Sequence, residues 1–320
     1  MTAIKRALRL VLTLCVCWSA LAHAQPYPSR PVTVIIPFPP GGTLDVVGRQ
    51  LAQKLSEQMG QPFVVENRAG AGGIIGGNML AKAAPDGYTL MFSASTSSTT
   101  EMVIKNVPYS VVKDFHPVAL VAKAPLSVAV NNDLPVKDIK GLIDYGQANP
   151  GKLTFAIGSS ASAGHLAAEL LKSMSGLQYT IVPYKGSSPA YNDLIGGRIS
   201  GFIDPILGAA GFAKAGQLKV IAVTSKERVP NMPDVPTVGE SLPGYEFYSW
   251  YGLWGPANLP ADITEKLNVQ VNKALLSMEP KLAPQGLLVT PGSVQDFVKF
   301  QNDYIKLTQK IVTEGNIRAE

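Results

Sequence analysis

Short runs of β-branched and other apolar residues alternate along the chain with segments in which apolar residues recur every three or four positions. The first run, Val32-Thr33-Val34-Ile35-Ile36, is typical of a buried strand. The apolar residues that follow it fall on one stripe of a helix, and Gly60 is placed to end that helix. The stripe consists of Leu44, Val47, Leu51, Leu55 and Met59.

The same alternation continues along the chain and predicts an α/β protein. Repeated strand–helix units favour parallel sheets covered by helices. The units form two groups, before and after about residue 125, which indicates two domains. Two late helices, at 262–278 and 293–313, follow a complete second domain, so we expect them to return to the first. The other predicted strands are 63–65, 88–92, 153–157, 179–182, 199–203 and 218–223. The other predicted helices carry Ile75, Met79 and Ala83, then Ile139, Leu142 and Ile143, then Leu166, Leu170 and Met174, and the last runs to Ile195 with Ser188 as N-cap before Pro189.

Residues 1–24 have the three parts of a secretory signal peptide: a basic start, a short apolar segment and a small-residue cleavage site. The apolar segment is shorter than the ~20 residues that a membrane span needs, and an uncleaved anchor is the alternative. The signal peptide predicts export, to the periplasm, with cleavage after Ala24. Because cleavage would remove both cysteines, we expect no disulfide and no cysteine-bound metal in the mature chain. The basic residues are Lys5, Arg6 and Arg9, the apolar segment runs from Leu10 to Leu21, the cleavage site is Ala22-His23-Ala24, and the cysteines are Cys15 and Cys17.

Composition and charge exclude several classes of protein. Of the 320 residues, 46% are hydrophobic and only 16% are charged, which is typical of a folded chain. The 28 bases and 23 acids give a net charge of +5, which falls to +2 without the three bases of the signal segment. No basic stripe is left, so we predict no binding to nucleic acid. Beyond residue 24 no run of 18 apolar residues predicts a membrane span.

Three loops that each follow a strand are candidates for ligand contact, since open parallel sheets bind ligands at the carboxyl ends of their strands. The first, Pro37 to Asp45, contains Gly41-Gly42 just before a helix, and this arrangement suits close approach of an anion to backbone N–H groups. The alternative is a tight turn with Thr43 as N-cap and with Asp45 bonded to backbone amides.

The other two loops are rich in hydroxyl side chains. In the second, Ser93 to Thr100, seven of the eight residues are serine or threonine. This loop is either a solvated linker or a row of neutral hydrogen-bonding groups that faces a cleft. The third, Gly158 to His165, opens a helix, and its serines can cap that helix or contact a ligand.

The sequence gives little support for catalysis. A secreted α/β serine hydrolase is the alternative from another class, but the Gly158–His165 loop lacks the last glycine of the Gly-x-Ser-x-Gly nucleophile elbow. His165 falls near the third position of its helix, where its ring supports the loop, and His116 precedes a proline in a predicted turn. Asp45 and Asp204 form an acid–base pair only in principle. No spacing of His or carboxylate residues indicates a metal site. We predict no catalytic residue, no metal and no cofactor.

Nine short motifs follow one another in order over nearly all of the chain beyond the signal segment. They are Tyr27 to Pro31, Pro37 to Asp45, Val65 to Gly73, Ala84 to Leu90, Lys113 to Phe115, Val182 to Gly186, Asp193 to Gly197, Ala222 to Ser225 and Pro233 to Val238. This ordered set resembles the Bug family, the periplasmic solute receptors of tripartite tricarboxylate transporters.

The resemblance implies a two-lobed Venus flytrap of type II periplasmic-binding-protein topology, with two parallel-rich sheets. We place lobe 1 at 25–125 plus 250–320 and lobe 2 at 126–249, with a hinge near Lys123–Val130 and Tyr248–Gly255. The resemblance implies a small organic carboxylate as ligand and membrane transporter subunits as partners, and we expect a monomer. A sensor that reports its ligand to a signalling protein is a third interpretation.

In the family, the loops matching Pro37–Asp45 and Gly158–His165 hold one carboxylate, while the loop matching Ser93–Thr100 and the position of Asp204 line the distal side. The aromatic segment Tyr245 to Trp254 is interpreted as a crossover strand that packs both lobes, in preference to a stacking platform for an aromatic acid. The residues expected to bind the ligand are Phe38, Pro40, Gly41, Gly42, Thr43, Asp45, Ser93, Ser95, Ser97, Ser159, Ser160, Ser162, His165 and Asp204.

Overall fold

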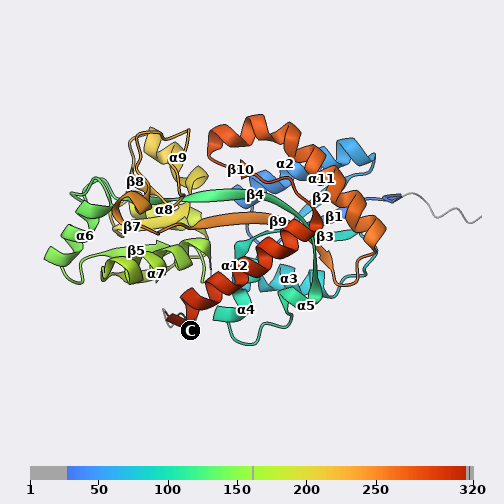
Figure 1. The fold of residues 1–320 in the computed structure, drawn as a ribbon, viewed down its shortest axis with the longest axis horizontal. Helices are drawn as coiled ribbons and strands as arrows, with labels where there is room; N and C mark the ends of the chain where they lie inside the picture. Colours follow the sequence, from blue (N-terminus) through green and yellow to red (C-terminus); the bar gives the residue numbers. More distant parts are fainter. Residues whose placement is uncertain (1–26, 161, 315–316, 318–320) are drawn as a thin grey trace, which may run out of the picture.

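One long strand, β4 (Phe115–Val130), belongs to both halves of the molecule (Figure 1). The computed structural model describes residues 27–160, 162–314 and 317, so the predicted signal segment and its cleavage site lie outside the described residues. The first half of β4 pairs with β9 (Tyr248–Pro256) as far as Pro125, and from Leu126 onward β4 pairs with β7 (Gly201–Pro205) and β8 (Lys219–Val223). The strand therefore leaves one sheet and enters another without a break.

The two sheets define the two lobes. Lobe 1 is built on β2 (Phe63–Asn67), β1 (Val32–Ile36) and β3 (Thr89–Ala94), which lie next to β9, β4 and the short β10 (Leu288–Val289). Lobe 2 is built on β6 (Thr180–Pro183), β5 (Thr154–Ile157) and β7, with β8 on the other edge of β4.

Both sheets are mixed. The strands proper to each lobe pair in parallel, β1 with β2 and β3, and β5 with β6 and β7. Every pairing of the crossover strands β4 and β9 is antiparallel. The α/β fold and two lobes are confirmed, and the parallel order expected for the sheets holds within each lobe but not at the crossover.

Helices cover both faces of each sheet. In lobe 1, α2 (Thr43–Met59) and α11 (Ala261–Leu282) bury their apolar stripes on one face, and α3 (Ile74–Ala81) and α12 (Val294–Glu314) lie on the other. In lobe 2, α6 (Ile139–Ala148) and α7 (Ala163–Ser175) cover one face, and α8 (Ser187–Ile195) and α9 (Ile206–Lys214) the other. The short elements are α4 (Thr100–Val103), α5 (Val111–Asp114), α10 (Val238–Ser241), η1 (Ala71–Gly73), η2 (Ser95–Ser98) and η3 (Ala283–Gln285).

The buried face of α3 is not the predicted one. Ile75 and Met79 are 49% and 39% exposed, whereas Gly76, Gly77 and Leu80 are buried. A Cβ atom on Gly76 would lie 2.7 Å from the Cβ atom of Pro37. Because α3 packs so closely through its glycines, the large apolar residues of the stripe are left on the outside.

The aromatic segment forms the crossover strand β9. Trp250 and Trp254 are fully buried and pack against Phe297 of α12, with ring centroids 5.7 and 5.2 Å from the phenylalanine ring. Ser249 and Tyr251 alternate with them and face the opposite side of the sheet, where they line a cavity. The late helices α11 and α12 both contact β4, α11 also contacts α2, and α12 also contacts α7 of lobe 2.

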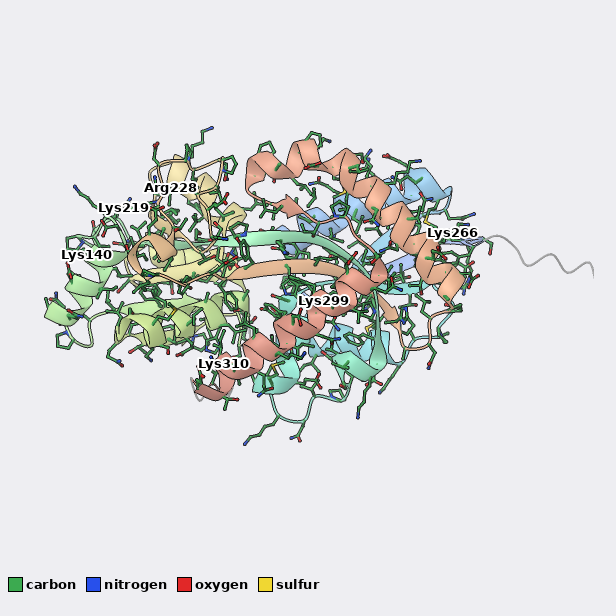
Figure 2. All side chains as sticks on the ribbon, in the orientation of Figure 1. Lys140, Lys219, Arg228, Lys266, Lys299 and Lys310 are labelled. Carbon is green, nitrogen blue, oxygen red and sulfur yellow. The ribbon has the colours of Figure 1, made fainter. Side chains whose placement is uncertain are left out.

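Basic side chains are spread over the outside of both lobes, from Lys140 at one end to Lys266 at the other (Figure 2). Several are paired with a carboxylate: Lys140 with Asp144, Arg228 with Glu240 and Lys299 with Asp303, at 2.5 to 2.7 Å. Among the described residues, no helix is long and apolar enough to cross a membrane.

Candidate ligand-binding site

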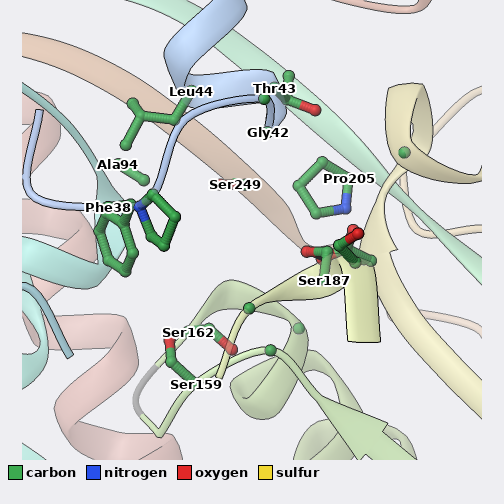
Figure 3. Close-up of a pocket in the computed structure, with 18 of the residues that line it drawn as sticks. Phe38, Gly42, Thr43, Leu44, Ala94, Ser159, Ser162, Ser187, Pro205 and Ser249 are labelled. Atoms are coloured by element: carbon green, nitrogen blue, oxygen red, sulfur yellow. Dashed lines mark hydrogen bonds between the residues drawn. The ribbon is translucent and has the colours of Figure 1, made fainter. Parts of the chain in front are cut away.

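A cavity of about 530 Å³ lies between the lobes, at the carboxyl ends of the strands (Figure 3). The first residues of four helices line it: α2 from lobe 1, and α7, α8 and α9 from lobe 2. Its volume falls in the range of sites for small ligands. Such a convergence of helix N-termini turns backbone N–H groups and the positive ends of the helix dipoles toward one space.

The start of α2 is built from glycine. Gly42 is the N-cap, with a φ of −82° and no side chain to cap the helix, and the first intrahelical bond joins the Val46 amide to the Gly42 carbonyl. The predicted N-cap, Thr43, is instead the first helical residue. A Cβ atom on Gly42 would meet nothing within 4 Å, and the left-handed conformation is at Gly41, with a φ of +91°. Gly42 therefore leaves the amides of this turn open to the cavity.

Asp45 fixes this turn from behind. Its carboxylate accepts hydrogen bonds from the Gly41 amide at 3.0 Å, from Arg49 Nε at 3.0 Å and from Asn67 Nδ2 at 2.9 Å. Burial raises the pKa of Asp45, but the hydrogen bonds from Arg49, Asn67 and Gly41 outweigh it and hold that pKa below its usual value. Asp45 is 4% exposed and does not line the cavity, so it is a positioning residue.

The start of α7 presents serine from the opposite lobe (Figure 3). Ser159 and Ser162 line the cavity, whereas Ser160 is half-buried beside it. Ser162 is the N-cap, and its hydroxyl accepts a hydrogen bond from the His165 amide at 3.2 Å. The hydroxyl is therefore engaged in capping, and the amides of Ala163 and Gly164 remain at the helix start.

His165 is a buried residue at the third position of α7, where the sequence places it. Its Nε2 atom lies 4.0 Å from Glu169 Oε1. Burial lowers the pKa of His165 to about 4, so the ring is neutral at pH 7. It does not line the cavity.

The hydroxyl-rich loop is buried rather than solvated. Ser93 and Ser97 bond to each other at 2.7 Å between their Oγ atoms, and Ser95 is fully buried. These three residues do not line the cavity; Ala94 and Thr96, between them, do. The residues of this loop that face the cavity are thus the neighbours of the predicted ones.

Asp204 is the last residue but one of β7, on the lobe 2 side of the cavity. Its Oδ1 atom accepts a hydrogen bond from Ser187 Oγ at 2.9 Å, and its Oδ2 atom accepts one from Tyr191 OH at 3.2 Å. Burial raises the pKa of Asp204 to about 7, although both hydrogen bonds lower it. Asp204 is half-buried and lines the cavity together with Pro205.

Sequence reasoning did not select the starts of α8 and α9 as candidates for ligand contact. The helix that was expected to begin with Ser188 as N-cap begins at Ser187, with Gly186 as N-cap at a φ of +108°. The strand–helix rule that selected three loops applies equally to the turns after β6 and β7. The cavity-lining residues missed in this way are Lys185, Gly186, Ser187, Ser188, Pro189, Tyr191, Pro205, Leu207, Gly208 and Phe212.

The predicted residues divide into two sets. Those that line the cavity are Phe38, Pro40, Gly41, Gly42, Thr43, Ser159, Ser162 and Asp204, and those that do not are Asp45, Ser93, Ser95, Ser97, Ser160 and His165. Asp45 and Asp204 do not form a pair, since Asp45 is bound to Arg49 outside the cavity. In the described part of the chain, no group of three or more His, Cys, Asp or Glu residues is placed to hold a metal ion.

The fold and the cavity define a two-lobed binding protein whose site lies between the lobes. The sequence model described as "Tripartite tricarboxylate transporter family receptor" matches residues 47–317. Protein BugT of Bordetella pertussis is 36% identical over 288 residues, which cover 88% of each chain. The chain belongs to this family of tripartite tricarboxylate transporter receptors, as the motifs predicted.

Solved structures agree with this assignment. A Rhodopseudomonas palustris protein, Rpa4515 with adipate, superposes with a TM-score of 0.87 at 35% identity, covering 91% of this chain and 99% of its own. MatC from the same species, with bound malate, superposes with a TM-score of 0.81 at 30% identity, covering 89% of this chain and 100% of its own.

Proposed function

We propose that this chain is a periplasmic receptor that binds a small carboxylated organic anion between its lobes and delivers it to a tripartite membrane transporter. The observation that carries the proposal is the opposition of two helix starts, α2 and α7, across one cavity. Each helix start offers amides with no intrahelical partner and about half a positive charge. Adipate and malate in the two structural neighbours support this class of ligand.

A carboxylate suits these helix starts better than a phosphate or a neutral group does. Among the described residues, Lys185 is the one basic residue of the lining, and it is exposed. Two helix ends together supply about one positive charge, which matches a single carboxylate. Gly42 has no side chain, so the backbone on that side can approach the carboxylate closely, and Ser159 lines the cavity on the other side.

Ligand capture by closure of the lobes follows from the topology. We propose lobe 1 as 25–125 plus 250–320 and lobe 2 as 126–249, with the hinge where β4 changes partners between Pro125 and Leu126. Because Gly42 and Ser162 belong to different lobes, a ligand that contacts both would stabilise the closed form. We propose that the closed monomer is the form that the transporter recognises.

We also propose that the site is not catalytic. The Ser162 hydroxyl caps α7, and the neutral His165 ring has a pKa too low for a general base at pH 7. A ligand recovered unchanged after long incubation is the expected result. Turnover of generic esters would favour the hydrolase alternative.

We also propose that the signal segment is cleaved after Ala24. An intact mass that retains residues 1–24 would contradict this cleavage.

The decisive experiment is a thermal-shift screen of organic acids against their neutral amides. The acid and its amide have nearly the same shape, so the difference isolates the carboxylate. We expect acids to raise Tm and amides not to, since a ligand at 100 times its Kd adds about 2.7 kcal/mol of stability. Equal shifts for acids and amides, or no shift for any acid, would refute the proposed function.

A further inference from the structure

The lining of the cavity has one acidic residue among the described residues, Asp204, which belongs to lobe 2. It stands at the end of β7, between the first residues of α8 and α9. Ser187, which bonds to it, is the first residue of α8. A Cβ atom on Gly208 of α9 would lie 2.9 Å from Asp204 Oδ2. The protein thus places its own carboxylate beside the starts of these two helices.

This placement makes the helix starts that line the cavity electrostatically different. At the α2 and α7 starts the helix dipoles face open space, and a ligand carboxylate supplies the missing negative charge. At the α8 and α9 starts the negative charge is already present. A second ligand carboxylate there would meet a like charge at close range, which is unfavourable in a partly desolvated site.

Asp204 still has capacity to accept hydrogen bonds. An ionised carboxylate has about four lone-pair sites, and the structure records hydrogen bonds from Ser187 and Tyr191. Among the described residues, Lys185 is the one basic residue of the lining, and none of the salt bridges joins it to Asp204. A donor on the ligand would therefore supply the partner that the protein does not.

We propose that Asp204 makes this receptor selective for acids that carry, besides the bound carboxylate, a hydrogen-bond donor that reaches Asp204, above all an ammonium group, and that it disfavours plain dicarboxylates. The inference rests on the proposed function, because it assumes a carboxylate at the α2 and α7 starts. It predicts a preference different from the adipate held by the R. palustris neighbour. Burial raises the pKa of Asp204 to about 7, and a nearby ammonium would favour the ionised form.

The test is a series of acids that differ only in the distal group. ω-Aminopentanoate, ω-hydroxypentanoate, hexanoate and adipate have nearly the same length, and the set is repeated one methylene shorter with ω-aminobutanoate, pentanoate and glutarate. Calorimetry at pH 8 keeps Asp204 mostly ionised. We expect the amino acid to bind at least about tenfold more tightly than the dicarboxylate, with the hydroxy acid between them.

The variant Asp204→Asn keeps the size and the acceptor oxygen but removes the charge. We expect it to weaken binding of the amino acid, to strengthen binding of the dicarboxylate and to leave hexanoate nearly unchanged, so that the ranking narrows or reverses. The wild-type ranking is informative by itself, so the test does not depend on the folding of the variant.

Three results would be contradictory in different ways. Dicarboxylates that bind more tightly than amino acids to the wild type at pH 8, with the same ranking in Asp204→Asn, would overturn this inference and leave the proposed function intact. A preference for adipate that disappears in Lys185→Gln would assign the distal end to Lys185 and would also overturn it. If neither these probes nor any other screened acid binds, the proposed function itself fails.

Discussion

The helix starts that line the cavity are used in two opposite ways, and we call the α2 start the open end and the α8 and α9 starts beside Asp204 the occupied end. At the α2 start, Gly42 provides no side chain and the nearest carboxylate, Asp45, is turned away into bonds with Arg49 and Asn67. At the α8 and α9 starts, Asp204 faces the cavity. The positive end of the α2 dipole is therefore free to bind an anion from the ligand. The positive ends of the α8 and α9 dipoles already have the Asp204 carboxylate beside them. The comparison teaches that the placement of one carboxylate decides what each helix start can bind.

Gly42→Val is expected to have the largest effect, because it closes the open end. The side chain would project into the space above the amides without straining the backbone, since φ is −82° and no atom lies within 4 Å. Loss of charge-assisted hydrogen bonds should weaken binding about 100-fold, as measured by calorimetry with the acid that the screen identifies. The matched control is Gly211→Val, an exposed glycine of α9 that does not line the cavity and also has open space around it. If Gly42→Val stays folded and binds normally, the carboxylate does not lie at this end.

Lowering the pH should remove the negative charge of Asp204 at the occupied end. Asp204 has a pKa of about 7, so it takes up a proton between pH 8 and pH 6, and the repulsion of a ligand carboxylate then disappears. Adipate should bind about tenfold more tightly at pH 6 than at pH 8. Neighbouring Tyr191 and Tyr251 have pKa values raised above 10 by burial, and His165 titrates near 4, so none of them changes charge in this window. Asp204→Asn should abolish the pH dependence; a slope that persists in this variant would assign it to another group.

Asp204→Asn should also stabilise the ligand-free protein. This variant tests whether the carboxylate of Asp204 lowers the stability of the folded state. A carboxyl group whose pKa is raised in the folded state opposes folding increasingly as pH rises from about 4 to about 7, and fully above that. The Tm of the variant should therefore exceed that of the wild type by a few degrees at pH 8. The difference should vanish near pH 4. An equal or lower Tm at pH 8 would show that the carboxylate is satisfied without ligand.

Ser162→Ala is expected to have the smallest effect on binding. It removes a side chain from the α7 start, where we propose that backbone amides bind the carboxylate. Its hydroxyl bonds to the His165 amide, so its loss costs about 1 kcal/mol of stability as a missing N-cap. Binding should weaken less than about threefold, since the amides of α7 remain. Denaturant unfolding and calorimetry separate the two effects. A loss of binding as large as that of Gly42→Val would make the hydroxyl, and not the backbone, the main contact.

The sequence by itself determined most of the strands and helices in their order, although not β4 or α9, and it located the open end at the α2 start. Period-2 and period-3.6 patterns are local, so β1, α2, α7 and the two late helices were predicted with boundaries close to the observed ones. The ordered motifs gave the family, and the strand–helix rule led to Gly42 and Ser159. The same local reading failed on α3, because Gly76 brings that helix against Pro37 and so reverses its buried face.

Only the tertiary structure decided which side chains share the cavity. Asp45 and Asp204 look alike in sequence, each an aspartate close to the junction of a strand and a helix, yet Asp45 is held by Arg49 from one turn along α2 and by Asn67 from a neighbouring strand. Asp204 is instead met by hydroxyls from α8 and faces the cavity. Ser93, Ser95 and Ser97 turn away from the cavity while Thr96 faces it. The physical reason is that the direction of a side chain, and therefore its partners and its charge, depends on contacts between segments far apart in the sequence, and no local pattern records those contacts.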